Sequence, residues 1–279
     1  IPKNVQIATA DYEPEQPVTA QRLSSFTEDD LSEALNLIKS SKKPFIYAGG
    51  GVLLSDASKE LGDFAEKIDA PVGSSMMALG VMDADNERFL GMTGMHGKYI
   101  ANKVMYESDL LIAVGTRFSD RATGNKKGFA EGKKFIHIDI DPAEIGKNIS
   151  AKVSLIGDVK EILGTLVSAL PTPLKNEWNG YIKAEKAKPE YCLDMDKTRL
   201  NPQSVIETVN KYADPDTVVA TDVGQHQMWT AQYYKFSRPH TFITSGGLGT
   251  MGFGLGAAIG AATATGKKTV LFTSDGSFH

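Results

Sequence analysis

Short apolar runs alternate with segments of helical periodicity along most of the chain. The apolar runs that predict strands are 44–48 (PFIYA), 71–75 (PVGSS), 109–115 (DLLIAVG), 134–140 (KFIHIDI) and a short run ending at Gly157. The helices predicted near them span 57–68, 98–106 and a last stretch from Asp158 to Leu170. Strands that are apolar throughout and separated by helices favour a parallel sheet covered on both faces, with ligands at the carboxyl ends of the strands.

The segments that flank this unit have a different pattern. Residues 1–26 are rich in Pro, Gln and Thr and are predicted to form an extended connector. Thr27 and Asp30 have the spacing of a capping box, which predicts the start of a helix. Residues 171–200 contain Pro171, Pro173 and a Lys/Glu-rich run, and they are predicted to be a linker with helical content at 178–186.

A second α/β unit is predicted from Asn201 onward. Its strands are 217–221, 241–244 and 269–273, and its helices begin near Pro202, Gln225 and Thr250. The predicted fold class is therefore α/β, with two doubly wound parallel-sheet (Rossmann-like) domains at 27–170 and 201–279, the second truncated.

Composition narrows the classes of function. A length of 279 residues with 41% apolar residues suffices for two cores, and a net charge of −4 gives no reason to expect nucleic acid as a partner. No apolar run approaches the roughly 18 residues of a membrane span. The single Cys192 cannot form an internal disulfide, which fits a reducing compartment. The start at Ile1 and the end at His279 suggest an internal fragment, in which a targeting segment would not be visible.

Loops at the predicted strand ends of the first unit carry residues typical of a dinucleotide site. Glycines bring backbone close to a phosphate, arginines suit a pyrophosphate, and an acid accepts from a ribose hydroxyl. The candidates are Gly49, Gly50, Gly51, Gly94, Met95, His96, Gly115, Thr116, Arg117, Asp120, Arg121, Asp139, Ile140, Gly157 and Asp158. Two plainer explanations stay open: Arg117 and Arg121 form a surface ion pair with Asp120, and His96 makes only a helix-terminal hydrogen bond.

Glycine and acid residues also mark the second unit. Four glycines fall inside one predicted helix, and at roughly 1 kcal/mol each they predict close approach by a backbone or a flat ligand; they are Gly252, Gly254, Gly256 and Gly260. Asp275 follows a buried-type strand and precedes Gly276, a position suited to a hard cation beside a phosphate.

These motifs together resemble those of a known enzyme family. GGLGTMGFG at 246–254, VGQHQMW at 223–229 and DGSF at 275–278 are similar to thiamine diphosphate enzymes, and most similar to acetohydroxyacid synthases, also called acetolactate synthases. In the first unit AGGG, GMHG, VGTRFSDRATGN and IHIDIDPAEI follow the order and spacing of that family's FAD-binding middle domain. Catabolic acetolactate synthases share the fold but lack FAD and usually the arginine loop, so the loop favours the FAD-containing branch.

The resemblance implies an activity and its cofactors. The family condenses two 2-keto acids, pyruvate with pyruvate or 2-ketobutyrate, with loss of CO2 through a thiamine diphosphate carbanion, in branched-chain amino acid biosynthesis. It implies FAD on the first unit, and it implies thiamine diphosphate and Mg2+ on the second. It also implies a homodimer or homotetramer, with or without a regulatory subunit, located in the cytoplasm of bacteria or in an organelle of eukaryotes.

The resemblance also implies roles for individual residues. Asp275 would ligate Mg2+, and diphosphate contacts would come from Val223, Gly224, Gln225, His226, Gly276 and Ser277. Gly249 and Met251 would face the aminopyrimidine ring. The family's catalytic glutamate lies in an N-terminal domain that these 279 residues do not include, so no catalytic residue is assigned and this chain alone is expected to be inactive.

Two positions depart from the family pattern. Ser274 stands where the family has Gly before its Asp, and its side chain could narrow the approach to a diphosphate. Ser119 replaces one of the two acids of the family's RFDDR loop. The alternatives to this function are another thiamine diphosphate-dependent lyase or decarboxylase, and a flavin- or nucleotide-binding module without catalysis.

Overall fold

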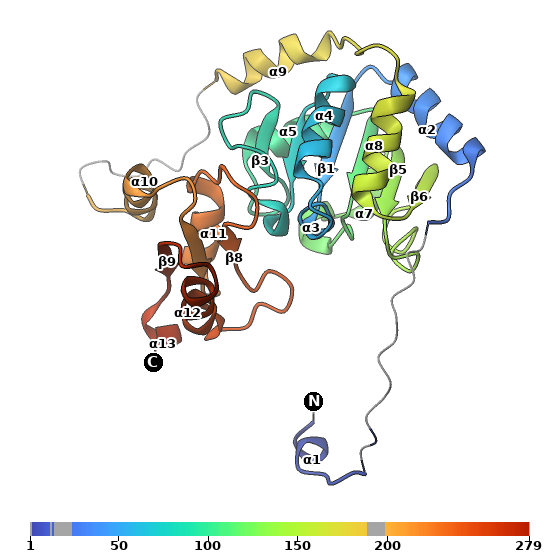
Figure 1. Ribbon diagram of the computed structural model, residues 1–279. Helices are drawn as coiled ribbons and strands as arrows, with labels where there is room; N and C mark the ends of the chain where they lie inside the picture. Colours follow the sequence, from blue (N-terminus) through green and yellow to red (C-terminus); the bar gives the residue numbers. More distant parts are fainter. Residues whose placement is uncertain (1, 12, 14–23, 189–198, 279) are drawn as a thin grey trace.

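A six-stranded parallel sheet forms the larger part of the molecule (Figure 1). The computed structural model describes residues 2–11, 13, 24–188 and 199–278. The strands are β1 (Pro44–Ala48), β2 (Val72–Ser74), β3 (Phe89–Met92), β4 (Leu110–Val114), β5 (Lys134–Asp139) and β6 (Val153–Ile156). Their order in the sheet, β3-β2-β1-β4-β5-β6, reverses direction between β1 and β4. The carboxyl ends of these two strands therefore form the crevice where such folds bind ligands.

Helices cover both faces of this sheet, as the uniformly apolar strands predict. One face carries α2 (Glu28–Ser40), α3 (Gly50–Leu54), α4 (Ser58–Lys67) and α8 (Val159–Ala169). The other carries α5 (Tyr99–Glu107), α7 (Lys126–Ala130) and α9 (Trp178–Lys186). Along β4, Leu110, Ile112 and Val114 enter the first core, whereas Leu111 and Ala113 enter the second. This alternation makes the strand apolar throughout.

The second unit has a three-stranded parallel sheet in the order β8-β7-β9. Its elements are α10 (Pro202–Tyr212), β7 (Val218–Thr221), α11 (Gln225–Tyr233), β8 (Phe242–Ile243), α12 (Phe253–Thr265), β9 (Thr269–Phe272) and α13 (Asp275–Phe278). Because β8 and β9 pair with opposite sides of β7, the strand order reverses at β7. The carboxyl ends of β7 and β9 therefore lie side by side.

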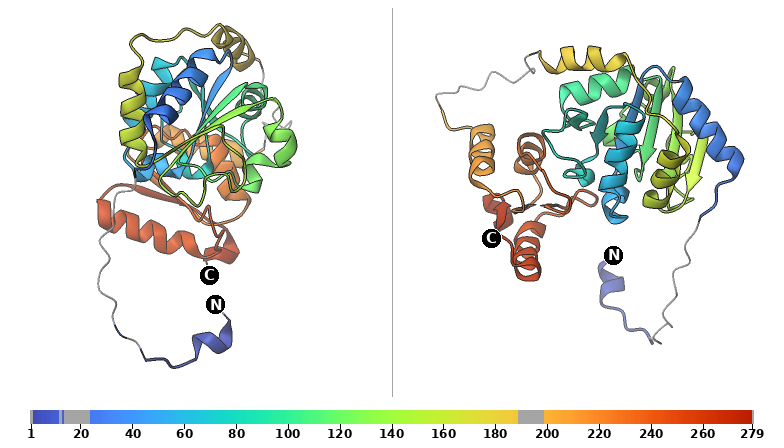
Figure 2. Two further views of the ribbon diagram at one scale, coloured as in Figure 1. Left: turned by 90° about the vertical axis from the view of Figure 1, so that its right-hand side faces the viewer. Right: turned by 45° about the horizontal axis from the view of Figure 1, so that its top comes forward.

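The two units contact each other through a small apolar core. Leu79 and Met92 of the first unit pack with Tyr234 and Phe236 of the second. The Ala84 N–H donates to the Phe236 carbonyl at 3.1 Å, which fixes the register of the contact. In the views of Figure 2 the helix α12, in red, lies on the side of the second unit that faces away from the six-stranded sheet.

Most helix starts follow from local sequence. Thr27 and Asp30 form the predicted capping box, with the Asp30 N–H donating to the Thr27 hydroxyl at 3.1 Å. Asp158 caps α8, and Asn201 followed by Pro202 opens α10. The helix predicted at 178–186 is α9.

Three local expectations were wrong or incomplete. Lys3–Gln6 form one helical turn (α1) in a segment predicted to be extended. The glycine run at 49–51 leads directly into α3, where no helix was predicted. The strand β3 was missed because it has four residues and contains Gly91, whose φ of 92° is unusual for a strand. The domain and linker boundaries stay predictions.

No helix among the described residues has the length and apolar character needed to cross a membrane. Cys192 lies outside the described residues, as do residues 1, 12 and 14–23 of the predicted connector.

Candidate functional site

The predicted dinucleotide loops do lie at one edge of the large sheet. Gly49 follows β1, Gly115 follows β4, Asp139 ends β5 and Gly157 follows β6, and all these strands are parallel. The 94–97 loop follows β3 at the same edge. The structure thus gathers the first set of candidate residues around the reversal point between β1 and β4.

The glycine run at 49–51 packs against the loop after β4 and does not present a free row of N–H groups. The Gly49 N–H donates to the Val114 carbonyl at 2.8 Å, and the Gly51 N–H donates to the Gly115 carbonyl at 3.0 Å. A Cβ on Gly49 would lie 2.1 Å from the Gly115 oxygen, and one on Gly51 would lie 2.7 Å from the Gly115 Cα. The expectation that these N–H groups are available to an anion is therefore wrong for Gly49 and Gly51, because another backbone uses them.

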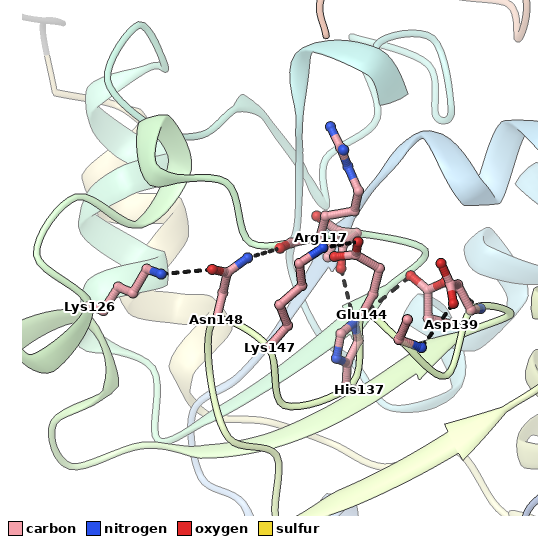
Figure 3. A network of polar contacts seen from close by, with 10 residues as sticks. Arg117, Lys126, His137, Asp139, Glu144, Lys147 and Asn148 are labelled. Atoms are coloured by element: carbon pink, nitrogen blue, oxygen red, sulfur yellow. Dashed lines mark hydrogen bonds and ion pairs between the residues drawn. The ribbon is translucent and has the colours of Figure 1, made fainter.

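The loop after β4 points Arg117 outward by burying its neighbour. Phe118 has a φ of 52° and only 2% of its surface is exposed. Its ring lies 6.1 Å from that of Tyr47 and 5.2 Å from that of His137, measured between centroids. With Phe118 anchored in this aromatic cluster, the exposed Arg117 side chain extends away from the sheet (Figure 3).

The surface ion pair proposed as an alternative is absent from the described residues. Neither Arg117 nor Arg121 pairs with a carboxylate there, and Asp120 accepts from the backbone N–H of Arg121 at 2.9 Å. The Arg117 contact that the structure does show is made by its carbonyl, which accepts from the Asn148 amide at 2.9 Å (Figure 3). The Arg117 guanidinium is thus exposed at the crevice and available to an anion.

His137 and Asp139 support this loop from β5. The buried His137 Nε2 lies 2.9 Å from the Thr116 carbonyl, so this nitrogen carries the proton, and Nδ1 has no partner. Burial lowers the pKa of His137 despite the nearby Asp139 carboxylate, so the ring is neutral near pH 7. Burial also favours the neutral form of Asp139 and therefore raises the pKa of its carboxyl group, which accepts a hydrogen bond from the Asp141 N–H at 3.0 Å. Next to it, Ile140 is 53% exposed.

The 94–97 loop connects the two units. The Asn102 side chain fixes Gly94 by bonds to its N–H at 2.7 Å and its carbonyl at 2.8 Å. The Met95 N–H donates to the Arg121 carbonyl at 2.7 Å, which joins this loop to the arginine loop. The Gln232 side chain of α11 donates to the His96 carbonyl at 2.7 Å. The bond at His96 is therefore made by its backbone to a neighbouring unit, not by its side chain at a helix terminus.

Asp158 is occupied as a helix cap. Its carboxylate accepts from the N–H groups of Lys160 at 2.9 Å and Glu161 at 3.4 Å. Gly157 before it donates to the Asp139 carbonyl at 3.0 Å. Their contact with a cofactor stays a prediction.

The second candidate site is organised by Asp222, which sequence analysis did not assign. Asp222 follows β7 and is fully buried. Its carboxylate accepts from the N–H groups of Val223 at 2.7 Å, Gly252 at 3.0 Å and Gly254 at 2.7 Å. Burial raises the pKa of Asp222, but these donors and the Ser277 hydroxyl outweigh it and bring the pKa to about 2. The signal in the sequence was an acid directly after a strand, the same signal that pointed to Asp275.

Asp222 explains two of the four glycines in the helix. A Cβ on Gly254 would lie 2.7 Å from the Asp222 nitrogen, and Gly252 has a φ of 88° as it caps α12. The close approach expected from the glycine count is confirmed at Gly254. At Gly252, Gly256 and Gly260 nothing described lies within 4 Å of an added Cβ, so the close approach expected there is not found, and Gly252 is favoured by its φ instead.

The residues predicted to contact the diphosphate surround this carboxylate. Val223, Gly224, Gln225 and His226 form the entry to α11, and Gly276 and Ser277 lie in α13 beside it. The His226 Nε2 is buried without a partner. Burial lowers the pKa of His226, although the charge of Asp222 opposes this shift. Among the described residues no cluster of three or more His, Cys, Asp or Glu side chains exists, and Asp275 is the acidic residue predicted here as a metal ligand.

The 246–251 loop lies across the same strand ends. Gly249 has a φ of 65°, and a Cβ there would lie 3.9 Å from the Val223 side chain. The Met251 side chain is 67% exposed. Gly249 therefore lies near the Val223 side chain, and the contact of Gly249 and Met251 with an aminopyrimidine ring stays a prediction.

Two family models match the chain. The model for the thiamine pyrophosphate enzyme central domain matches residues 31–166, and the model for the thiamine pyrophosphate enzyme C-terminal TPP binding domain matches residues 222–279.

Curated relatives share this similarity over most of the chain. The acetolactate synthase large subunit of Corynebacterium glutamicum is 43% identical over 289 residues, which cover 100% of this chain and 46% of the relative. The acetolactate synthase isozyme 1 large subunit of Escherichia coli is 40% identical, with 99% of this chain and 49% of the relative covered. The acetolactate synthase large subunit of Buchnera aphidicola subsp. Schizaphis graminum is 42% identical, with 89% of this chain and 44% of the relative covered. The chain therefore spans about half the length of these relatives.

Proposed function

Because the chain belongs to the thiamine pyrophosphate enzyme family, we propose that it supplies the central and cofactor-binding regions of an acetolactate synthase. The proposed reaction condenses two 2-keto acids with loss of CO2, in branched-chain amino acid biosynthesis. The observation that carries the proposal is the second candidate site, which lies at the carboxyl ends of β7 and β9; this site and the one at the carboxyl ends of β1 and β4 are called the strand-end sites below. There the buried Asp222 carboxylate accepts hydrogen bonds from three segments: the turn before α11, the start of α12, and α13.

The second site fits the diphosphate end of thiamine diphosphate. The cofactor itself supplies the acidic carbon and the electron sink for the chemistry. The α11 entry at Val223–His226, together with Gly276 and Ser277, is proposed to hold its diphosphate. The buried, unpartnered Nε2 of His226 leaves a polar atom beside this entry that a ligand or water would satisfy.

Asp275 is proposed as a Mg2+ ligand at the same place. Mg2+ prefers octahedral oxygen coordination and commonly takes one or two carboxylates plus phosphate and water. Asp275 is exposed at the start of α13, next to the turn that Asp222 organises. Because the described residues hold no cluster of three or more His, Cys, Asp or Glu side chains, the diphosphate and water would complete the shell.

FAD is proposed for the crevice between β1 and β4. The Arg117 guanidinium, which is exposed and has no ion-pair partner among the described residues, suits its pyrophosphate, and the Asp139 carboxylate would accept from a ribose hydroxyl. The 94–96 loop and Thr116, Asp120, Arg121 and Ile140 border the same edge. The glycines at 49–51 contribute by letting two loops approach, since their N–H groups at positions 49 and 51 are already bonded.

The proposed assembly follows the same reasoning from relatives. An active enzyme would be a homodimer or homotetramer with 2-keto acids as substrates, with or without a regulatory subunit, and bacterial relatives favour a cytoplasmic location. The arginine loop distinguishes this proposal from another thiamine diphosphate-dependent lyase.

The distinguishing experiment is flavin retention. The purified chain, incubated with FAD and passed through a desalting column, is expected to show the visible absorption of bound flavin. The same treatment with thiamine diphosphate and Mg2+ tests the second site separately. A chain that retains no flavin at any concentration, while its circular dichroism shows a folded protein, would favour the FAD-independent lyase.

A further inference from the structure

A cavity of about 480 Å3 lies between the two units, next to the 94–97 loop but lined by other residues than the two strand-end sites. Its walls come from β3 and α5 of the first unit, from α9, and from α10, α11 and the segment after it. In Figure 1, α9 (yellow) spans from above β3 toward α10. None of the residues predicted to hold a cofactor lines this cavity. Its volume is in the range of ligand pockets, and such pockets favour domain interfaces.

The lining of this cavity combines an apolar surface with an excess of cations. Buried side chains that contribute to it include Leu79, Phe89, Leu90, Met92 and Phe236. Among the described residues, five lysines and two glutamates also line it. Its ionisable side chains are therefore unbalanced toward positive charge.

Three of the five lysines already have carboxylate partners. Glu185 pairs with both Lys103, at 3.3 Å, and Lys188. Lys235 pairs with Asp85 at 2.7 Å. The other lining acid, Glu207, accepts a hydrogen bond from the Gln203 amide at 2.8 Å.

The remaining two lysines have no acidic partner in the described part of the chain. Lys186 donates to the carbonyls of Glu87 at 2.9 Å and Phe89 at 3.3 Å, which carry no net charge. No hydrogen bond or ion pair with a described side chain compensates the Lys98 ammonium. Burial, and after it the positive charge of Lys98, lowers the pKa of Lys186, and the weaker effect of the Glu87 charge opposes this shift.

We propose that this cavity binds an apolar monocarboxylate, an aliphatic or aromatic acid. Its carboxylate would lie between Lys98 and Lys186, and its hydrocarbon part would contact the surface of Phe89, Met92 and Phe236. One carboxylate suits two uncompensated ammonium groups, and the apolar lining disfavours a strongly hydrated inorganic anion. Because both units line the cavity, the ligand would also hold them together. This proposal does not depend on the proposed catalytic function.

The first test compares a charged and an uncharged probe on the full chain. Binding of 4-(trifluoromethyl)benzoate is followed by the 19F signal of the probe, and 4-(trifluoromethyl)benzamide is the control with the same apolar part. Saturable benzoate binding is expected, with the amide about tenfold weaker, since a charge-assisted hydrogen bond is lost. Equal affinity of the two probes, or no benzoate binding up to millimolar concentration, would overturn the proposal.

Variants locate the binding. Lys98→Met and Lys186→Met are each expected to weaken benzoate about tenfold, whereas Lys186→Arg keeps the charge and is expected to retain most of the affinity. Lys235→Met is the matched control, because Lys235 lines the same cavity but is already paired with Asp85. If Lys235→Met weakens the probe as much as the other two, or if neither Lys98→Met nor Lys186→Met changes affinity, the probe binds elsewhere and the proposal is wrong.

Discussion

Replacing Asp222 by asparagine tests how the second site is held together. In Asp222→Asn one acceptor oxygen becomes an NH2 group, so at least one of the N–H groups of Val223, Gly252 and Gly254 loses its acceptor and faces a donor. A hydrogen bond to a charged group contributes roughly 1.5–3 kcal/mol, and a buried unsatisfied donor adds a penalty. We expect the second unit to lose about 3 kcal/mol of unfolding free energy.

The pH dependence of stability gives a second estimate of how much the Asp222 carboxylate contributes to the free energy of unfolding. Folding lowers the pKa of Asp222 from its ordinary value of 3.8 to about 2, so the folded state prefers the ionised form. A depressed pKa contributes stability that is complete above the unfolded pKa and is lost as pH falls toward the folded one. Roughly 2 kcal/mol should therefore disappear between about pH 4 and pH 2. The asparagine variant lacks this group, so its difference from the parent should shrink over that window.

The assay is urea unfolding followed by tryptophan fluorescence. The chain has two tryptophans, Trp178 in α9 and Trp229 in α11, so a Trp178→Phe background reports on the second unit alone. Asp214→Asn is the matched control, because Asp214 is exposed and pairs with Lys268 at 3.4 Å, and we expect it to change stability by less than about 1 kcal/mol. If Asp222→Asn behaves like Asp214→Asn, or if its effect is the same at pH 2 and pH 7, the assignment of Asp222 as the organising carboxylate fails.

Three further predictions concern the two strand-end sites. Arg117→Ala should lower the affinity for FAD by about one to two decades, as measured by flavin fluorescence titration. The control is Lys147→Ala, which removes a nearby lysine that is paired with Glu144. An unchanged FAD affinity in Arg117→Ala would mean that Arg117 does not bind FAD. Gly254→Ala should destabilise the second unit by about 1–3 kcal/mol, because the added Cβ would clash with the Asp222 backbone. Gly256→Ala has open space for its Cβ and should stabilise α12 by up to about 1 kcal/mol. Equal effects of the two variants in thermal unfolding would contradict the close approach at Gly254. The chain alone should bind thiamine diphosphate with Mg2+ no tighter than the millimolar range and form no acetolactate, because the exposed Asp275 carboxylate alone is a poor Mg2+ site. Micromolar binding in calorimetry would show that the described residues already form a complete cofactor site.

The architecture could be predicted from sequence because its signals are local. The uniformly apolar run 110–114 is a strand buried on both faces, and the alternation of such strands with helices specifies a parallel sheet. Capping residues such as Thr27 and Asp158 mark helix starts within three residues. These patterns do not require knowledge of what lies across the molecule.

The detailed chemistry of the sites depends on distant partners, and sequence analysis was weaker there. Gly49 and Gly51 were interpreted as an anion cradle, but their partner is Gly115, more than 60 residues away. Asp222 was overlooked because its acceptor role depends on Gly252 and Gly254, which the chain brings back after another strand and turn. The type of a residue shows which hydrogen bonds it can form, but its partner depends on which distant residues the fold brings next to it.

The central claim is tested most directly by acetolactate formation in a chimera. This chain matches the Corynebacterium glutamicum large subunit over its whole length, so it can replace the matched 46% of that enzyme. With pyruvate, thiamine diphosphate, Mg2+ and FAD, the chimera is expected to form acetolactate, and the same chimera carrying Asp275→Ala is expected to form none. A folded, oligomeric chimera that retains FAD and thiamine diphosphate yet releases CO2 from pyruvate without forming acetolactate would contradict the account and identify a decarboxylase instead.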